Sequence, residues 1–149
     1  FQEYVRKYPP TEADKFQINN FKSQLALAYG KAKDFKSYYE WSKGLSKAIV
    51  ASNNNNLAWD MAEADENLEE AKKMAADASS YTKNELQHPT EKKPDEYTAK
   101  QWEDQRKSSY AMFGDTYAFI LYKLGDYKTA YPFAKEAATI NKLKDAEPD

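Results

Sequence analysis

The chain has 149 residues and a net charge of −2, and its Lys/Arg and Asp/Glu residues are interspersed. This length suits one domain, spanning residues 1–149, and the mixed charge offers no basic surface for nucleic acid. Because the sequence contains no Cys, disulfides, thiolate metal sites and a cysteine nucleophile are excluded within these residues.

The first 50 residues predict three helices. The first has apolar residues at helical spacing and stops at Pro9-Pro10; they are Phe1, Tyr4, Val5 and Tyr8. Thr11 to Asp14 resembles a capping box and opens a helix to about Lys33, with one apolar face made of Phe21, Leu25, Ala28 and Tyr29. A turn at Asp34-Phe35 leads into a third helix to about Val50, with Tyr38, Trp41 and Leu45 facing inward.

The centre of the chain predicts a second pair of helices. Ser52 and the run Asn53 to Asn56 supply capping groups for a helix ending near Asp65. Asn67 is then expected to cap the next helix, whose buried stripe is Leu68, Ala71, Ala75 and Ala78.

The last third predicts a polar insert followed by a long helix and a terminal helix. Residues 84–96 contain His88, Pro89 and Pro94 among polar residues, a loop composition. Thr98 with Gln101 opens a helix to Leu124, and Asp126 caps a last helix ending near Asn141, with a frayed end from Lys142. Pro132 removes a backbone hydrogen bond inside that helix, so we expect a tolerated kink.

Three turns share one pattern, an aromatic or apolar residue followed three residues later by a small or aromatic one. The pairs are Phe35 with Tyr38, Leu68 with Ala71, and Tyr127 with Ala130. Placed at positions 17 and 20 of a tetratricopeptide repeat (TPR), they predict an all-α fold of about three TPR-like antiparallel hairpins in a short α-solenoid.

No reactive constellation accompanies this pattern, so we expect a segment without catalytic, cofactor-binding or metal-binding residues. Paired carboxylates such as Asp60 and Glu63 fit a solvated helix face, and His88 is the only histidine. No glycine-rich phosphate loop is present. The longest apolar run, Tyr117 to Tyr122, is far shorter than the about 20 residues of a membrane span.

TPR hairpins bind partners through their first helices, which here mix polar, acidic and aromatic residues. Trp102 is added because it lies beyond the ordinary first helix, where it would cover the insert or dock against another domain. The candidate interaction surface is Asn20, Asn53, Asn56, Asp60, Glu63, Trp102, Met112, Asp115, Phe119, Tyr122 and Lys123. The carboxylate clamp of chaperone-binding TPRs is not expected, because Ser23, Leu27, Leu57 and Met112 occupy its places.

Two segments resemble a known family. Asn55-Asn56-Leu57-Ala58-Trp59, with Glu66 to Ala71, resembles the "N-x-x-A-W…E-N-L-E-E-A" hairpin of bacterial envelope thioredoxin-like (TlpA/AhpC-type) thiol–disulfide oxidoreductases. The segments Tyr97 to Trp102 and Tyr110 to Ala118 are similar to their following hairpin. The resemblance implies a periplasmic or envelope protein whose thioredoxin domain lies outside these residues. The family's Cys-x-x-Cys motif is absent, so no catalytic residue is carried over. Because the sequence begins at Phe1 rather than Met, we expect a processed protein or a segment of a larger one.

Three functions therefore stay open. The first is a non-catalytic scaffold that contacts a neighbouring thioredoxin-like domain. The second is part of an outer-membrane glycan-binding lipoprotein, in which Trp102, Tyr110 and Phe119 stack on sugar rings. The third is a TPR adaptor for an extended peptide. All three require a protein or glycan partner and none requires nucleic acid.

Overall fold

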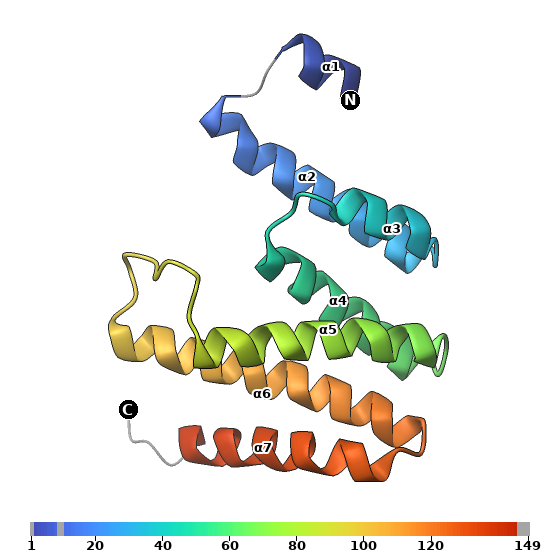
Figure 1. Cartoon of the computed structure of the whole chain (residues 1–149), viewed down its shortest axis with the longest axis vertical. Helices are drawn as coiled ribbons and strands as arrows, with labels where there is room; N and C mark the ends of the chain where they lie inside the picture. Colours follow the sequence, from blue (N-terminus) through green and yellow to red (C-terminus); the bar gives the residue numbers. More distant parts are fainter. Residues whose placement is uncertain (1, 9–10, 146–149) are drawn as a thin grey trace. The chain divides into compact units, whose positions relative to one another are not determined.

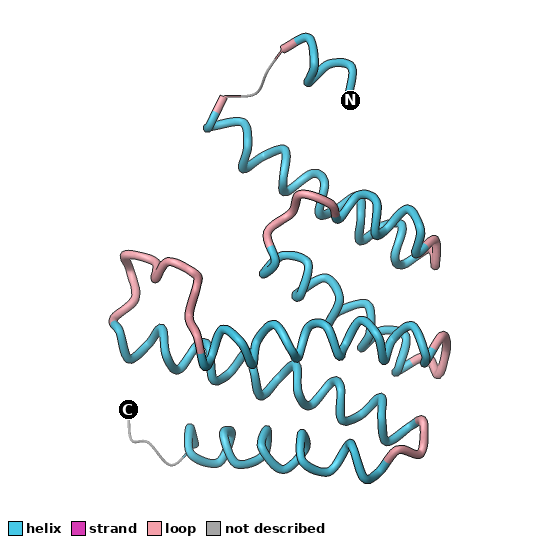
Figure 2. The backbone as a smooth tube through the Cα atoms, in the orientation of Figure 1, coloured by secondary structure: helices cyan, strands magenta, loops and turns pink. Residues whose placement is uncertain are grey.

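The computed structural model describes residues 2–8 and 11–145, and over these residues the chain forms seven α-helices and no strand (Figures 1 and 2). The helices are α1 (Gln2–Lys7), α2 (Glu12–Lys31), α3 (Phe35–Ser42), α4 (Lys47–Glu63), α5 (Leu68–Gln87), α6 (Ala99–Lys123) and α7 (Tyr127–Asp145). The all-α prediction is confirmed. By its contacts the chain divides into two compact units, Phe1–Val50 and Ala51–Asp149.

In the first unit, α2 packs against α3. At the start of α2 the Asp14 carboxylate accepts the Thr11 backbone N–H at 2.9 Å, the interaction that a capping box predicts. The small residue Ala26 is fully buried, whereas the predicted face residues Phe21 (51% exposed) and Ala28 are exposed. The predicted face is therefore wrong for Phe21 and Ala28, whereas its other two residues, Leu25 and Tyr29, are half-buried. Phe1 lies outside the described residues.

The third helix ends earlier than predicted. α3 stops at Ser42 rather than Val50, since Gly44 adopts a left-handed conformation (φ +80°) and Leu45 N–H donates to the Ser42 carbonyl at 3.1 Å. Tyr38 is fully buried and Leu45 is buried, as predicted, while Trp41 is half-buried.

The asparagine run does not cap α4. That helix begins at Lys47, and its cap is Ser46, whose Oγ accepts the Ile49 N–H at 3.3 Å. Residues 53–56 therefore lie in the middle of the helix, and three of these asparagines are buried, namely Asn53, Asn54 and Asn55. Ser46 caps the helix about two turns before Asn53, so the asparagine run has no helix end to cap.

In the second unit, α6 packs against both α5 and α7. The α5 stripe is confirmed for Ala71, Ala75 and Ala78, all with no exposed surface, whereas Leu68 is half-buried. Ala51 of α4 and Phe113 of α6 meet Ala78 in a buried cluster, so small residues let three helices converge.

The polar insert is shorter than predicted, because α5 continues to Gln87 and leaves residues 88–98 as the connection. Glu85, 5% exposed, holds the connection with its carboxylate, which accepts N–H groups of Thr90 (2.9 Å) and Glu91 (3.2 Å) as well as the Thr90 hydroxyl. Burial alone raises the pKa of Glu85, but these hydrogen bonds, with the positive charge of Arg106, outweigh it and lower that pKa.

The last two helices match their predicted caps. Thr98 and Gln101 exchange hydrogen bonds at 2.9 and 3.2 Å at the start of α6, and Asp126 accepts the Thr129 N–H at 3.2 Å at the start of α7. α7 continues to Asp145, four residues beyond the predicted end at Asn141. Pro132 lies inside this helix.

Three helix-to-helix turns have the same backbone geometry. Lys33, Asp65 and Gly125 all adopt a left-handed conformation, with φ of 63°, 58° and 79°. In each turn the following residue donates its N–H to a carbonyl five residues back: Asp34 to Tyr29, Glu66 to Met61 and Asp126 to Leu121. These are the hydrogen bonds of a Schellman motif.

Candidate functional site

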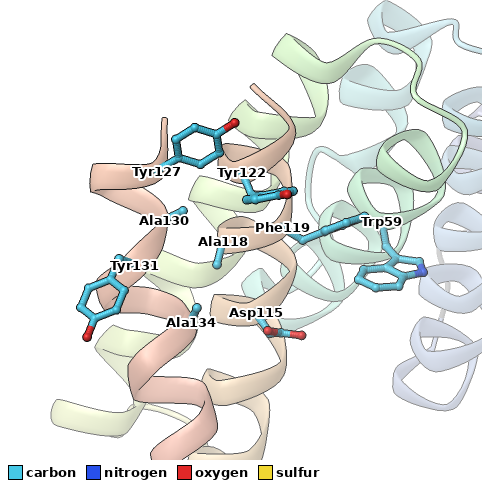
Figure 3. A pocket seen from close by; sticks show the side chains of 9 residues that line it. All are labelled: Trp59, Asp115, Ala118, Phe119, Tyr122, Tyr127, Ala130, Tyr131 and Ala134. Carbon is cyan, nitrogen blue, oxygen red and sulfur yellow. The ribbon is translucent and has the colours of Figure 1, made fainter. Parts of the chain in front are cut away.

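A groove of about 410 Å³ opens on the second unit between α6 and α7, with one side chain from α4 beside it (Figure 3). Its lining combines large rings with small residues and one carboxylate. The lining residues are Trp59, Asp115, Ala118, Phe119, Tyr122, Tyr127, Ala130, Tyr131 and Ala134.

The helical spacing of the lining residues explains the groove. On α6, Asp115, Phe119 and Tyr122 follow one another at intervals of four and three, so they share one face. On α7, Tyr127 and Tyr131 are one turn apart. The alanines lie between these two rows, and because a methyl group fills little space, the groove stays open between the rings (Figure 3).

The rings around the groove are packed against one another yet largely open to solvent. The ring centroids of Trp59 and Phe119 are 5.3 Å apart, and those of Tyr122 and Tyr127 are also 5.3 Å apart. Tyr122, Tyr127 and Tyr131 are 61%, 61% and 66% exposed. Aromatic rings gathered at this exposure are typical of a surface that contacts a partner.

Charge is concentrated at the same place. Asp115 lines the groove and is exposed. Lys123 pairs with Asp65 at 3.1 Å and places its Nζ 5.3 Å from the centroid of the Phe119 ring. The ammonium group at this edge is therefore already balanced by a carboxylate.

A second hollow of about 580 Å³ lies further along α6 and α7 and shares Tyr131 with the first; it is lined by Tyr110, Tyr131, Pro132, Lys135, Glu136, Thr139 and Ile140. Here the Tyr110 hydroxyl donates to a Glu136 carboxylate oxygen. Burial, this hydrogen bond and the Glu136 charge raise the pKa of Tyr110 to about 12. Because Tyr110 is 7% exposed, it is not the sugar platform that the glycan hypothesis expects.

Apart from Trp102, the predicted surface residues separate into three groups. Asp115, Phe119 and Tyr122 line the groove, as expected of a shared helix face. Others are exposed or half-buried without lining it, namely Asn20, Asn56, Asp60, Glu63, Met112 and Lys123. Asn53 is buried (5% exposed), so its place on the interaction surface is wrong. It lies on a covered face of α4, whereas Asn56 and Asp60 of the same helix are exposed.

Trp102 lies apart from the groove. Its ring is half-buried, 5.9 Å from the Tyr97 ring centroid and 5.6 Å from the Arg106 guanidinium carbon. Trp102 therefore contacts Tyr97 at the end of the 88–98 connection, just beyond the predicted insert at residues 84–96.

The sequence reasoning missed Trp59, Tyr127 and Tyr131. Trp59 lies on a helix, where burial is the default for tryptophan, yet it is 36% exposed. The two tyrosines lie on α7, a second helix, whereas only first-helix positions were searched. Their spacing of four, together with Ala130 and Ala134, was a visible signal.

The described residues contain neither a metal-binding cluster nor a helix that could span a membrane. Over the ranges 2–8 and 11–145 no three His, Cys, Asp or Glu side chains gather in a way that could hold a metal ion. In the same ranges no helix combines the length and apolar character needed to cross a bilayer.

No protein-family model matches the chain, and neither a curated protein nor a solved structure does.

Proposed function

We propose that this chain is a non-catalytic, TPR-like interaction module and that its aromatic groove binds an extended segment of another protein. The observation that carries the proposal is the groove itself. Three tyrosines, each more than 60% exposed, surround a floor of alanines there. Tyr and Trp are the residues that protein interfaces favour at their centres.

The repeated turns support the TPR-like part of the proposal. After each turn the fourth residue of the following helix is buried, namely Tyr38, Ala71 and Ala130, and its N–H donates to the carbonyl of the residue just before that helix. These are the residues that the sequence register assigns to equivalent positions. A fold of equivalent hairpins exposes a continuous row of first-helix side chains, which is where such proteins bind their partners.

The connection to a thioredoxin-like domain is a separate proposal supported by the sequence resemblance. In this proposal the chain accompanies such a domain in a periplasmic thiol–disulfide oxidoreductase and positions it. Sequencing the gene on both sides of the chain tests it. A flanking thioredoxin fold with Cys-x-x-Cys is the expected result, and flanks without either would remove the redox part while leaving peptide binding intact.

Selection from a random peptide library displayed on phage tests peptide binding directly. We expect enriched peptides that bind the wild-type chain and bind a Tyr131→Ala variant more weakly. The matched control is Tyr8→Ala, which removes a tyrosine that is 55% exposed but lies outside the groove. Failure to enrich any peptide, or equal loss in both variants, would count against the proposal.

A further inference from the structure

We infer that the segment held by the groove anchors itself there with an arginine side chain. This inference rests on the proposed function, since it names the chemistry of the partner that the groove accepts. It follows from three features of the groove: the ring faces that it exposes, the cations already placed against those rings, and the carboxylates that surround it.

The ring faces provide the first part of the argument. Aromatic rings carry negative charge on their faces, so a cation within about 6 Å of a ring centroid is attracted to it. Tyr122, Tyr127 and Tyr131 all line the groove, whose volume of about 410 Å³ leaves room for a side chain. In Figure 3 the rings of Tyr122 and Tyr127 lie near each other, and the Tyr131 ring extends separately from α7. A planar guanidinium also stacks on such rings, which an ammonium group does not do.

The chain's own cations show that these rings accept positive charge. Lys123 lies 5.3 Å from the Phe119 centroid, and Lys135 lies 5.9 Å from the Tyr131 centroid. Both rings line the groove. Elsewhere on α6, Arg106 takes the same position over Trp102 at 5.6 Å. An incoming arginine would repeat a contact that the fold already makes.

The carboxylates favour a cation over other ligands. Asp115 is inside the groove, while Asp60 and Glu63 are exposed on α4, beside Trp59 and one turn beyond it. On the positive side, Lys123 is paired with Asp65, Lys72 and Lys128 lie near Asp126 at the start of α7, and Lys135 lies over the Tyr131 ring. The surroundings are therefore net negative, and electrostatic complementarity selects a basic partner.

Other side chains fit this environment less well. An acidic side chain would meet Asp115 and the negative ring faces, which is repulsive. An apolar side chain would cover the rings but would desolvate Asp115 without giving it a partner. A lysine ammonium can make both contacts only as a point charge, whereas the arginine fork of N–H donors pairs with a carboxylate while its plane covers a ring, so arginine fits the groove best.

A titration with synthetic peptides tests the inference. The probes are short acetylated and amidated peptides in which leucine and serine flank one central residue, either arginine, citrulline or glutamate. Citrulline keeps the planar shape of arginine but carries no charge. Binding is followed by NMR through the ¹³C-labelled methyl groups of Ala118, Ala130 and Ala134, which line the groove, with Ala26 of the first unit as an internal reference.

We expect the arginine peptide to shift the groove methyls saturably and the citrulline peptide to bind about tenfold more weakly, since cation–π and ion-pair contributions are both lost. Asp115→Asn should weaken the arginine peptide about two- to fivefold and leave citrulline unchanged. The matched control is Asp77→Asn, an exposed carboxylate of α5 outside the groove, which should change neither. An unchanged methyl spectrum without peptide shows that each variant is folded.

Two results would overturn the inference. Equal binding of the arginine and citrulline peptides would mean that the groove does not select a cation, although it still binds peptide. Absence of any shift with the arginine peptide would also overturn it. The library selection then separates the cases: enriched peptides without arginine that need Tyr131 preserve the proposed function, whereas no enriched peptide removes both.

Discussion

Tyr110 joins α6 to α7 through a buried hydroxyl that donates to Glu136. We predict that Tyr110→Phe lowers the free energy of unfolding by about 1–2 kcal/mol, because a hydrogen bond to a charged acceptor is lost while the ring is kept. Urea unfolding at neutral pH measures this. Glu136→Gln is the control, since its amide oxygen still accepts the hydrogen bond.

The same hydroxyl gives a pH dependence with a definite sign. Its folded pKa, about 12, is raised above the ordinary tyrosine value of 10.0. The stabilisation that the Tyr110 hydroxyl gives the folded state is therefore fully present below a pH of about 10, and it is lost as the pH rises through the folded pKa. The difference between wild type and Tyr110→Phe should shrink over that window. A difference that stays constant into strong alkali would contradict the hydrogen bond.

Glu85 provides a second prediction at this scale, because it holds the 88–98 connection to α5 with three hydrogen bonds. Glu85→Ala should open the connection and speed tryptic cleavage after the exposed Lys92. Glu96→Gln, an exposed carboxylate of the same connection, should leave the cleavage rate unchanged. The Glu85 pKa is lowered in the folded chain, so its stabilising effect is present above the ordinary carboxyl pKa.

The stabilisation by the Glu85 carboxylate is lost as the pH falls through its folded pKa, because the protonated group no longer accepts these hydrogen bonds as a charged acceptor. Amide hydrogen exchange of the connection should therefore become faster, relative to the intrinsic rate, only in the acidic range. Protection that does not change with acid in the wild type would show that the carboxylate does not hold the connection.

At the scale of the elements, replacing a turn glycine and a helix glycine by alanine should change the stability of the fold in opposite directions. Gly125 has φ +79° and open space around a Cβ, so Gly125→Ala should cost about 1 kcal/mol of backbone strain alone. Gly114 lies within α6, and a Cβ there would meet only Phe133 Cδ1 at an ordinary 3.9 Å. Gly114→Ala should therefore stabilise by up to about 1 kcal/mol, since Ala is the better helix former.

Thermal unfolding measures both variants. A shift of about 4–8 °C per kcal/mol is expected for a unit of this size, downward for Gly125→Ala and upward for Gly114→Ala. An upward shift in Gly125→Ala would contradict the assignment of Gly125 to a left-handed turn, and a downward shift in Gly114→Ala would contradict the space found beside Gly114.

At the same scale, the elements show what sequence reasoning can and cannot reach. The caps at Thr11, Thr98 and Asp126 were predicted because capping depends on residues three apart in the chain. The asparagine run was misassigned because Asn favours caps in general, whereas Ser46 had already satisfied this helix end. The end of α5 was placed too early, since Glu85 bonds to residues beyond the helix, which composition does not reveal.

For the whole molecule, half of the groove was predictable. The row on α6 follows from helical spacing, but the tyrosines of α7 join it only because α6 and α7 pack together, a tertiary fact. The prediction that Asn53 lies on the surface was wrong for the same reason: its exposure depends on what packs around α4, which is also a tertiary fact. Each helix that forms the groove can be predicted from its own sequence, but the groove itself depends on how the helices pack together.

The groove predicts that its tyrosines serve binding rather than folding. Tyr131→Ala should change the free energy of unfolding by less than about 0.5 kcal/mol, since the side chain is 66% exposed. It should nevertheless weaken peptide binding, whereas Tyr8→Ala should affect neither property. Parallel unfolding and binding measurements on both variants check this. A large loss of stability in Tyr131→Ala would reassign the ring to the fold.

The most direct test of the central claim is a crystal structure of the chain with its most enriched library peptide. The account predicts that the peptide lies along α6 and α7, in contact with Phe119 and Tyr131, with a basic side chain beside Asp115. A peptide seated on α2 and α3 instead, with the groove empty, would contradict it.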